Sequence, residues 1–455
     1  MTEAIDTRPW YRQLNGYHWY VFALSAMGWL FDTMDGMIFT ISRSKVMENL
    51  IPANFDEKLL DPEALKLAKA ALAADRTDAG AYVTALFLAG WATGGLIFGV
   101  VGDRWGRAKT MALTIFIYAI FTGLSGFAQT WWQFGIIRFL TGIGVGGEFA
   151  AGAALIAEVM PSTARTQALG MLQSLSAVGN MMGAVIFWYV YPTWGWRWLF
   201  AVGALPAVLA VWVRAGLKEP DKWLEAKAQR ARGEHTKENA MGSISELFSD
   251  PTLRRNVIVG MVIAVSGVIG LWGVGFWSAE LIDNTFKTLP VEEATRLKSI
   301  GVILQQTGAF FGMFLFSVCA IRFGRRITFL IAFMIAWVAV FTTFYTLKEP
   351  SQVYYLWSLL GFGTLCPYGG FALYLPELFP TRLRTTGTGI CYNVGRYLAA
   401  IGPLALAGFS RKLEGNNPLG ISGFKAAAIM VASIYFVGML ALIWAPETKG
   451  KPLPE

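Results

Sequence analysis

The chain has 455 residues, of which 55% are hydrophobic and only 15% are charged, and its formal net charge is +8. This apolar fraction excludes an ordinary soluble globular domain. The positive charge does not indicate nucleic-acid binding, because Lys and Arg lie in short connectors and form no basic patch with interleaved aromatic residues.

Twelve apolar runs follow along the chain, each long enough for a helix to cross the hydrocarbon core of a membrane. The first six lie at 19–41, 80–101, 108–128, 131–156, 167–190 and 196–214, and the second six lie at 256–281, 300–320, 327–347, 352–375, 384–409 and 422–444. The pattern predicts an all-α membrane protein with twelve transmembrane helices in two pseudo-symmetric bundles. The predicted domains are an N-terminal bundle over 1–214, a polar linker over 215–255 and a C-terminal bundle over 256–455.

The connector between the first two apolar runs, 43–79, is long and carries charges of both signs. Within it, Asp61 and Pro62 precede a stretch in which apolar residues recur from Leu65 to Leu72. This pattern predicts an amphipathic surface helix that begins at the proline. Two interpretations stay open, a solvated cap packed on the outer rim of the bundle and a lid over a substrate site.

The short connectors divide into two sets by their content of Lys and Arg. The positive set contains Arg104, Arg107, Lys109, Arg165, Arg322, Arg325, Arg326, Arg382 and Arg384. Connectors of the opposite set at 128–131 and 191–195 contain neither residue, although Arg411 and Lys412 in the last one reduce the contrast. Since cytoplasmic loops carry the excess of Lys and Arg, both termini and the linker are predicted to be cytoplasmic.

An internal repeat relates the two halves. The segment from Glu158 to Arg165 after the fourth run, Glu-Val-Met-Pro-Ser-Thr-Ala-Arg, is echoed after the tenth run by Glu-Leu-Phe-Pro-Thr-Arg-Leu-Arg, from Glu377 to Arg384. A Gly-Arg pair that ends at Arg107 is likewise echoed later in the chain. The order and spacing predict parallel repeats related by an axis along the membrane normal.

The segment Gly102-Asp103-Arg104-Trp105-Gly106-Arg107 resembles the signature of the major facilitator superfamily, which lies between its second and third helices. The resemblance covers nearly the whole chain and implies transport by alternating access. In this loop an Asp can cap a helix N-terminus and pair with Arg, which would latch the two halves together. The predicted latch comprises Gly102, Asp103, Arg104, Gly106, Arg107, Glu158, Arg165, Glu377 and Arg384. The second copy of the signature departs from the pattern, because Ile321 stands where the acid belongs.

Four further segments resemble the proton-coupled organic-acid symporters of this superfamily, the aromatic-acid, sialate and nicotinate type. They are Phe31-Asp32-Thr-Met-Asp35-Gly36, the run from Arg138 to Glu148, Pro376-Glu377-Leu-Phe-Pro380 and Asn393-Val-Gly-Arg396. The resemblance implies a monomer in the bacterial inner membrane, in contact with lipid and with no nucleic-acid partner. Its substrates would be protons and a small organic anion, namely a monocarboxylate, an aromatic acid or a sugar acid.

A proton-coupled or facilitative porter of a neutral sugar or polyol is the alternative. The ending Pro446-Glu447-Thr448-Lys449-Gly450 is shared with sugar porters, and the long first connector is unlike the short one of the aromatic-acid branch. Dependence of binding on an anionic group separates the two hypotheses.

Charged side chains at membrane depth are costly, so the few that occur within the apolar runs are functional candidates. Asp32 and Asp35 lie on one helix face, and Asp35 and Arg138 fall at similar depths, which allows them to pair. Breaking and remaking such a pair would change the affinity of the carboxylate for a proton. The predicted proton-coupling residues are therefore Asp35, Asp32 and Arg138. The resemblance to proton-coupled sugar porters of the superfamily favours Asp35, because their proton-coupling acid on the first helix aligns with it. A static structural ion pair is the alternative.

Arg396 has no acidic neighbour one turn away on its own helix, so its guanidinium needs an acid from another helix or a bound carboxylate. Pairing with Glu148 or snorkelling to the interface are the alternatives. Gly142 and Gly146, four residues apart, are interpreted as a helix-packing surface. The predicted substrate-binding residues are Arg396, Asn393, Tyr392, Gln305, Gln306, Trp272, Trp277, Tyr368, Gln173 and Glu148.

The sequence does not indicate an enzyme. It contains no phosphate-binding loop and no Ser-His-Asp arrangement, and its three cysteines stand singly in apolar runs. His18 lies at the edge of the first run and His235 in the linker, so a carboxylate must carry any coupled proton. No metal or other cofactor is predicted.

Overall fold

The computed structural model describes residues 9–55, 61–205, 212, 216–232, 241–272, 274, 278–286, 288–399, 409, 410 and 412–454, and these residues contain helices and no strand. The first half contains η1 (Trp10–Arg12), α1 (Gly16–Leu50), α2 (Pro62–Trp105), α3 (Arg107–Ser125), α4 (Trp131–Val159) and α5 (Ser162–Gly203). The linker contains α7 (Asp221–Ala231) and α8 (Ile244–Ser249). The second half contains α9 (Pro251–Trp272), α10 (Ser278–Thr285), α11 (Val291–Phe323), α12 (Arg325–Thr346), η4 (Pro350–Gln352), α13 (Val353–Glu377), η5 (Thr381–Leu383), α14 (Arg384–Ala399), α16 (Gly423–Ala432) and α17 (Ile434–Ala441).

Nine helical segments of the described residues are long and apolar enough to cross a membrane. They lie in α2, α3, α4, α5, α9, α11, α12, α13 and the joined pair α16 and α17. The other three predicted spans correspond to α1, which carries three acids, to the second part of α5 and to α14. Gly195, with φ 77°, interrupts α5 and so separates the fifth and sixth spans. The predicted twelve-helix membrane fold is confirmed.

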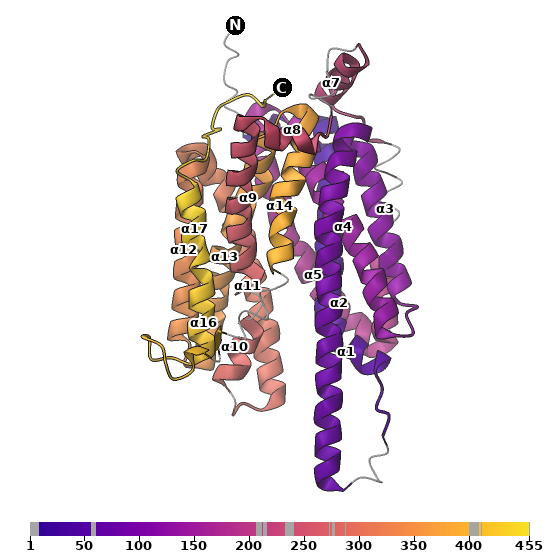
Figure 1. Ribbon diagram of the computed structural model, residues 1–455, viewed down its shortest axis with the longest axis vertical. Helices are drawn as coiled ribbons and strands as arrows, with labels where there is room; N and C mark the ends of the chain where they lie inside the picture. Colours follow the sequence, from indigo (N-terminus) through magenta and orange to yellow (C-terminus); the bar gives the residue numbers. More distant parts are fainter. Residues whose placement is uncertain are drawn as a thin grey trace.

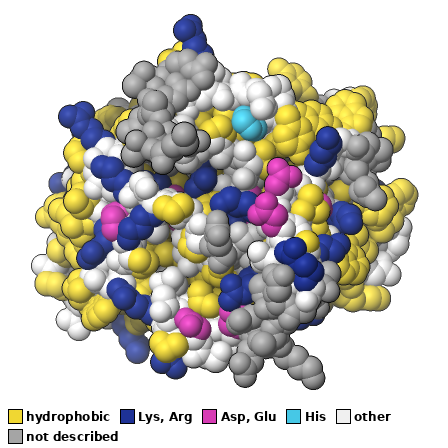
Figure 2. Space-filling view, turned by 90° about the horizontal axis from the view of Figure 1, so that it is seen from above, with side chains coloured by type: hydrophobic (Ala, Val, Ile, Leu, Met, Phe, Trp, Pro, Cys, Tyr) yellow, Lys and Arg dark blue, Asp and Glu magenta, His cyan; other side chains and the backbone are white. Residues whose placement is uncertain are grey.

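The helices run along the long axis of the molecule, and the first and last described residues lie at the same end (Figure 1). We call this end the terminal face. Figure 2 looks onto it and shows Lys and Arg side chains spread over the face, with hydrophobic side chains around its rim. Large apolar side chains are also exposed along the sides of the bundle, for example Phe116, Phe311 and Leu440. This distribution is that of a protein whose sides contact lipid.

The same helix pairs pack in both halves. In the first half α2 packs on α4 and α1 packs on α5, and in the second half α11 packs on α13 and α9 packs on α14. The halves meet along two lines. We call the packing of α2 on α14 the first seam and the packing of α5 on α11 the second seam.

The connector 43–79 differs from the prediction. Asp61 does cap a helix that begins at Pro62, accepting hydrogen bonds from the backbone N–H groups of Glu63 (3.0 Å) and Ala64 (2.9 Å). This segment is not a separate surface helix on the rim, however. It continues directly into the second span, because no helix-breaking residue intervenes before Gly80, and the result is a 44-residue helix, α2, that projects beyond its neighbours (Figure 1).

Candidate functional site

A buried ion pair joins α1 and α4. Arg138 Nη1 lies 3.1 Å from an oxygen of Asp35, and both side chains are fully buried. Ser125 Oγ accepts hydrogen bonds from the other guanidinium nitrogens, Nε at 3.1 Å and Nη2 at 2.8 Å. The ring of Phe200 lies 4.8 Å from the guanidinium carbon. Asp35 and Arg138, which were expected to pair because they fall at similar depths, are thus in contact. An aromatic ring and a hydroxyl group enclose the positive charge of Arg138.

Two more carboxylates are buried beside this pair. Asp32 lies on α1 one turn before Asp35, and Glu148 of α4 approaches α1 so closely that a Cβ at Gly28 would overlap its Oε1. Asp32 and Glu148 are each 2% exposed. Neither oxygen of Asp32, nor Oε2 of Glu148, accepts a hydrogen bond from the part of the chain that the structure describes. Asp32 is therefore buried without a hydrogen-bond donor among the described residues, and Glu148 has one oxygen without a donor, so a negative charge on either acid is poorly stabilised.

Arg396 of α14 lies close enough to Asp32 for an electrostatic interaction between their charges. Its Nη1 donates to the carbonyl oxygen of Tyr392 (2.8 Å) and to Oδ1 of Asn393 (3.0 Å). Its guanidinium carbon lies 4.2 Å from the ring centre of Trp91 and 4.3 Å from that of Tyr392. No carboxylate of the described residues forms an ion pair with it, and its Nε donates to none of their acceptors. The Nε–H group is thus available to a ligand.

The other predicted binding residues are not all gathered around Arg396. Tyr392 stacks on Phe149 of α4 with ring centres 4.1 Å apart, and Tyr368 lies edge-on to Tyr392 at 6.4 Å. Gln305 instead accepts a hydrogen bond from Ser278 of α10 (3.1 Å), and Gln306 accepts one from Asn180 across the second seam (3.2 Å).

Gln173 is 2% exposed, and its Oε1 has no donor among the described residues. Trp272 is the last residue of α9, and Trp277 lies outside the described residues.

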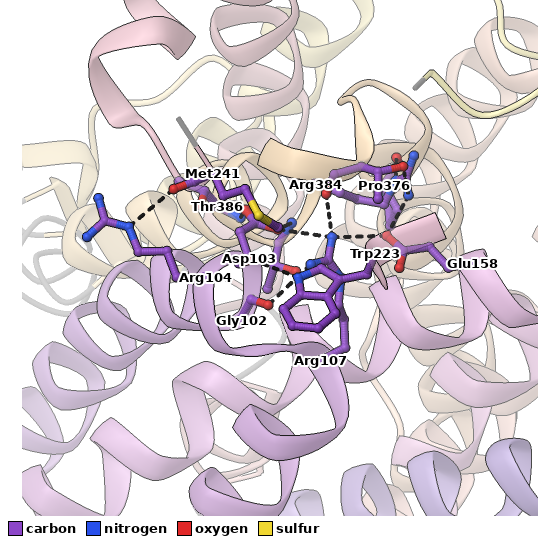
Figure 3. A network of polar contacts seen from close by, with 12 residues as sticks. Gly102, Asp103, Arg104, Arg107, Glu158, Trp223, Met241, Pro376, Arg384 and Thr386 are labelled. Atoms are coloured by element: carbon purple, nitrogen blue, oxygen red, sulfur yellow. Dashed lines mark hydrogen bonds and ion pairs between the residues drawn. The ribbon is translucent and has the colours of Figure 1, made fainter. Parts of the chain in front are cut away.

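Of the predicted latch residues, Asp103, Arg107, Glu158 and Arg384 meet at the terminal face of the first seam (Figure 3). Asp103, at the end of α2, accepts hydrogen bonds from the backbone N–H groups of Thr385 (3.1 Å) and Thr386 (2.8 Å) and from the Thr386 hydroxyl group (2.6 Å). It therefore caps the first turn of α14 in the other half. Arg107 Nη2 lies 3.2 Å from Asp103 and 3.1 Å from Glu158.

Glu158 extends this network across the halves, because it also pairs with Arg384 Nη1 at 2.5 Å. Arg384 in turn donates to the carbonyl oxygens of Pro376 (3.1 Å) and Pro454 (2.8 Å), so the C-terminal tail contacts the same network. Arg104 points elsewhere and donates from Nε to the carbonyl oxygen of Met241 in the linker (3.2 Å).

The second seam carries a related but different set of contacts. Arg325 pairs with Glu377 of its own half at 2.8 Å and crosses to the Thr166 hydroxyl group of α5 at 3.1 Å. Arg165, the counterpart of Arg384, forms no ion pair with any described residue, and its Nε has no acceptor among them. It interacts with Glu377 only at longer range.

Two glutamates that the sequence analysis did not single out cap equivalent helices. Glu219 of the linker accepts from the N–H groups of Ala108 (3.3 Å) and Lys109 (3.2 Å) at the start of α3. Glu447 of the tail accepts from those of Arg325 (3.0 Å) and Arg326 (3.1 Å) at the start of α12. Both acids stand beside a proline shortly after the last span of their half, and this third echo of the internal repeat could have identified them.

The linker and α2 contain further residues that sequence reasoning missed. Trp223 of α7 donates its indole N–H to the Asp103 carbonyl oxygen at 2.7 Å, and Glu246 of α8 pairs with Arg382. Trp91, beside Arg396, was also missed, because a tryptophan in an apolar run is most simply interpreted as core.

The profile of the Major Facilitator Superfamily matches residues 24–403. The cis,cis-muconate transport protein of Acinetobacter baylyi is 31% identical over 368 residues, covering 80% of this chain and 84% of that protein. The sialic acid transporter NanX of Escherichia coli is 27% identical over 450 residues, covering 97% of each. A solved structure of the proton:xylose symporter XylE, bound to 6-bromo-6-deoxy-D-glucose, matches with a TM-score of 0.69 at 19% identity, over 96% of this chain and 98% of that one.

Proposed function

The chain belongs to the major facilitator superfamily, a family of transporters and not of enzymes, and from this premise we propose that it carries a small organic anion into a bacterium together with protons. The protein would reside in the inner membrane with the terminal face toward the cytoplasm. The Lys and Arg side chains on that face support this orientation, since positive residues concentrate on the cytoplasmic side.

The proposal of an anionic substrate rests on the surroundings of Arg396. This side chain is 2% exposed and lacks an ion pair within the described part of the chain. A buried guanidinium that forms no ion pair is costly, and its Nε–H, which has no acceptor among the described residues, can donate to a carboxylate. The names of two relatives point the same way, because muconate and sialic acid both carry carboxyl groups.

The balance of charges around this arginine supports the proposed coupling to protons. The buried charge cluster consists of three acids, Asp32, Asp35 and Glu148, and two bases, Arg138 and Arg396. Fully ionised, the cluster has one excess negative charge, which a single proton neutralises. A bound anion adds another negative charge, so the anion and the proton each favour binding of the other. Mutual stabilisation of this kind is the thermodynamic basis of symport.

Comparing an acid with its own amide tests the anion hypothesis. The purified native protein should bind nicotinate better than nicotinamide, and Arg396→Ala should lose most of this preference. Arg396→Lys keeps the charge without the fork, so its affinity for the acid should fall between those of the native protein and of the alanine variant. If the native protein prefers the amide or a neutral sugar, or if Arg396→Ala binds the acid as tightly as the native protein, the neutral-solute porter becomes the better proposal.

The coupling is tested separately with Asp35→Asn in proteoliposomes. This variant should lose uphill uptake driven by a pH gradient but keep exchange of substrate across the membrane, because exchange needs no net movement of protons. Uphill uptake at the native rate would show that Asp35 does not carry the proton. Asp32→Asn, which alters the neighbouring acid of the same helix face, is the matched comparison.

A further inference from the structure

Trp91 lies on α2 of the first half, but its ring faces Arg396 of the second half. The guanidinium carbon is 4.2 Å from the ring centre of Trp91 and 4.3 Å from that of Tyr392. Contacts at this distance are attractive because the face of an aromatic ring is negative. The two rings lie against the guanidinium and leave its Nε–H without an acceptor among the described residues.

The backbone of α2 fixes the position of this indole. A Cβ at Gly146 would overlap the carbonyl oxygen of Trp91, and one at Gly142 would lie 2.8 Å from the Trp91 backbone nitrogen. These contacts confirm the packing role interpreted for the two glycines. The ring of Phe87 adds an edge-to-face contact with Trp91 at 5.7 Å. Because α4 contacts the backbone on one side and Phe87 contacts the ring, the indole is held in a defined orientation.

Two hydrogen-bond donors of this contact lack acceptors. Trp91 is 8% exposed, and its Nε1 donates to no acceptor among the described residues. The same holds for Nε of Arg396. A buried N–H group without an acceptor costs free energy, and native structures rarely leave one unpaired without a functional reason. A carboxylate, with about four lone-pair sites on two oxygens, can accept from both residues at once.

We propose that Trp91 is a substrate-binding residue, and that its indole N–H and the Nε–H of Arg396 together hold the carboxylate of the transported anion. This inference rests on the proposed function and adds a residue from the first half to the site. The carboxylate would then bind to α2 and α14 together, so both halves would recognise the same group. The ring face of Trp91 orients the guanidinium before the anion arrives, which reduces the ordering that binding requires.

The test uses the full-length purified protein with nicotinate, cis,cis-muconate and sialic acid as probes, and with nicotinamide as the neutral reference. Trp91→Phe keeps a ring face for Arg396 and removes only the N–H donor. Its affinity for a bound acid should fall roughly 10- to 100-fold, the range for a hydrogen bond to a charged group, while any affinity for nicotinamide should change little. A role in packing alone would weaken acid and amide equally.

Trp337→Phe is the matched control. Its indole Nε1 also has no acceptor among the described residues, but Trp337 lies on α12, where it packs against Phe341 and Phe436. This variant should bind the acids as the native protein does. Trp91→His, which retains a ring N–H, should recover part of the affinity lost in Trp91→Phe. If the phenylalanine variant does not fold, as judged by its melting temperature, Trp91→Leu replaces it in this comparison.

Three outcomes decide the matter. Selective loss of acid binding in Trp91→Phe with recovery in Trp91→His supports the inference. Unchanged acid affinity in Trp91→Phe, or equal affinity of the variants with and without the N–H, overturns it and leaves the proposed function intact. If the native protein binds none of the acids at millimolar concentration, the organic-anion function fails and this inference fails with it.

Discussion

The first seam joins α2 to α14, and the second seam joins α11 to α5. Because of the internal repeat, both seams have an arginine and a glutamate at the terminal face. Asp103 of the first seam accepts three hydrogen bonds from the start of α14. The equivalent position of the second seam holds Ile321, which is 38% exposed. Glu158 and Arg384 pair across the halves, whereas Arg165 forms no ion pair with the residues described.

The difference extends beyond one side chain, because the receiving helices begin at different places. α14 begins at Arg384, so the N–H groups of Thr385 and Thr386 belong to its first turn and have no acceptor within the helix. α5 begins earlier in the repeat, at Ser162, so Thr166 lies beyond the first turn and can donate within its own helix. An acid therefore strengthens a seam only where unpaired donors face it.

The largest effect is expected from Asp103→Asn. The change keeps the size of the side chain but removes the charge that Arg107 and the first turn of α14 stabilise. The equilibrium between the conformations closed and open at the terminal face should shift toward the open one by about 1–3 kcal/mol. Spin labels at Lys109 and Arg326, which are exposed residues near the starts of the equivalent helices α3 and α12, measure this opening as a longer distance. An unchanged distance distribution with normal transport would refute the latch.

A smaller effect is expected from Glu447→Gln, which tests the cap at the start of α12. Partial burial acts to raise the pKa of Glu447, but N–H donors of Arg325, Lys449 and Arg326 outweigh it and hold the pKa below the ordinary 4.5. The carboxylate therefore stabilises the folded chain above about pH 4.5, and this contribution is lost as the pH falls through the lower folded value. At neutral pH the loss should be about 1 kcal/mol or less, because the group is partly exposed.

The readout for Glu447→Gln is the melting temperature in detergent as a function of pH. The native protein and the variant should differ at pH 7 and converge as the pH falls below the ordinary pKa. Glu219→Gln, which alters the equivalent cap on α3, is the matched variant. A constant difference between native and Glu447→Gln proteins at every pH would show that the charge of Glu447 is not what stabilises α12.

The smallest effect is expected from Ile321→Asp, which introduces the missing acid into the second seam. If the acid alone made the latch, this variant would close the terminal face more tightly. Because the facing turn of α5 offers no unpaired N–H group, we expect a change below about 0.5 kcal/mol, as for an exposed charge. The same pair of spin labels measures it, and a shift as large as that of Asp103→Asn, in the opposite direction, would contradict the argument from helix starts.

The sequence allowed the fold to be predicted because its main determinants are local. Runs of apolar residues set the spans, and the echoed motifs set the relation of the halves. The resemblance to organic-acid transporters is confirmed by the muconate and sialic acid relatives. Counting residues from the ends of two spans was enough to place Asp35 and Arg138 at one depth, and the structure places them 3.1 Å apart.

The contacts that escaped prediction depend on helix orientation and on how distant segments return to the bundle. Nothing in the linker sequence indicates that Trp223 reaches the carbonyl oxygen of Asp103, because this contact exists only once α7 lies on the terminal face. The stacking of Trp91 on Arg396 likewise requires the rotation of α2 about its axis, which an apolar run does not encode. The continuity of α2 was missed because charged residues in 62–79 were interpreted as the mark of a separate surface helix.

Because α2 is long, a small rotation of the first half produces a large displacement at the far end of this helix. With 44 residues it extends about 66 Å, from a tip beyond the bundle to the latch beside Asp103. If the first half rotates by about 10° around the terminal face during transport, the tip moves by about 11 Å, more than any point within the membrane. A fluorophore at Leu67, which is 68% exposed near the tip, would turn a small hinge motion into a large displacement. Conversely, an antibody that binds the tip and restrains it would also restrain the rotation that opens the latch.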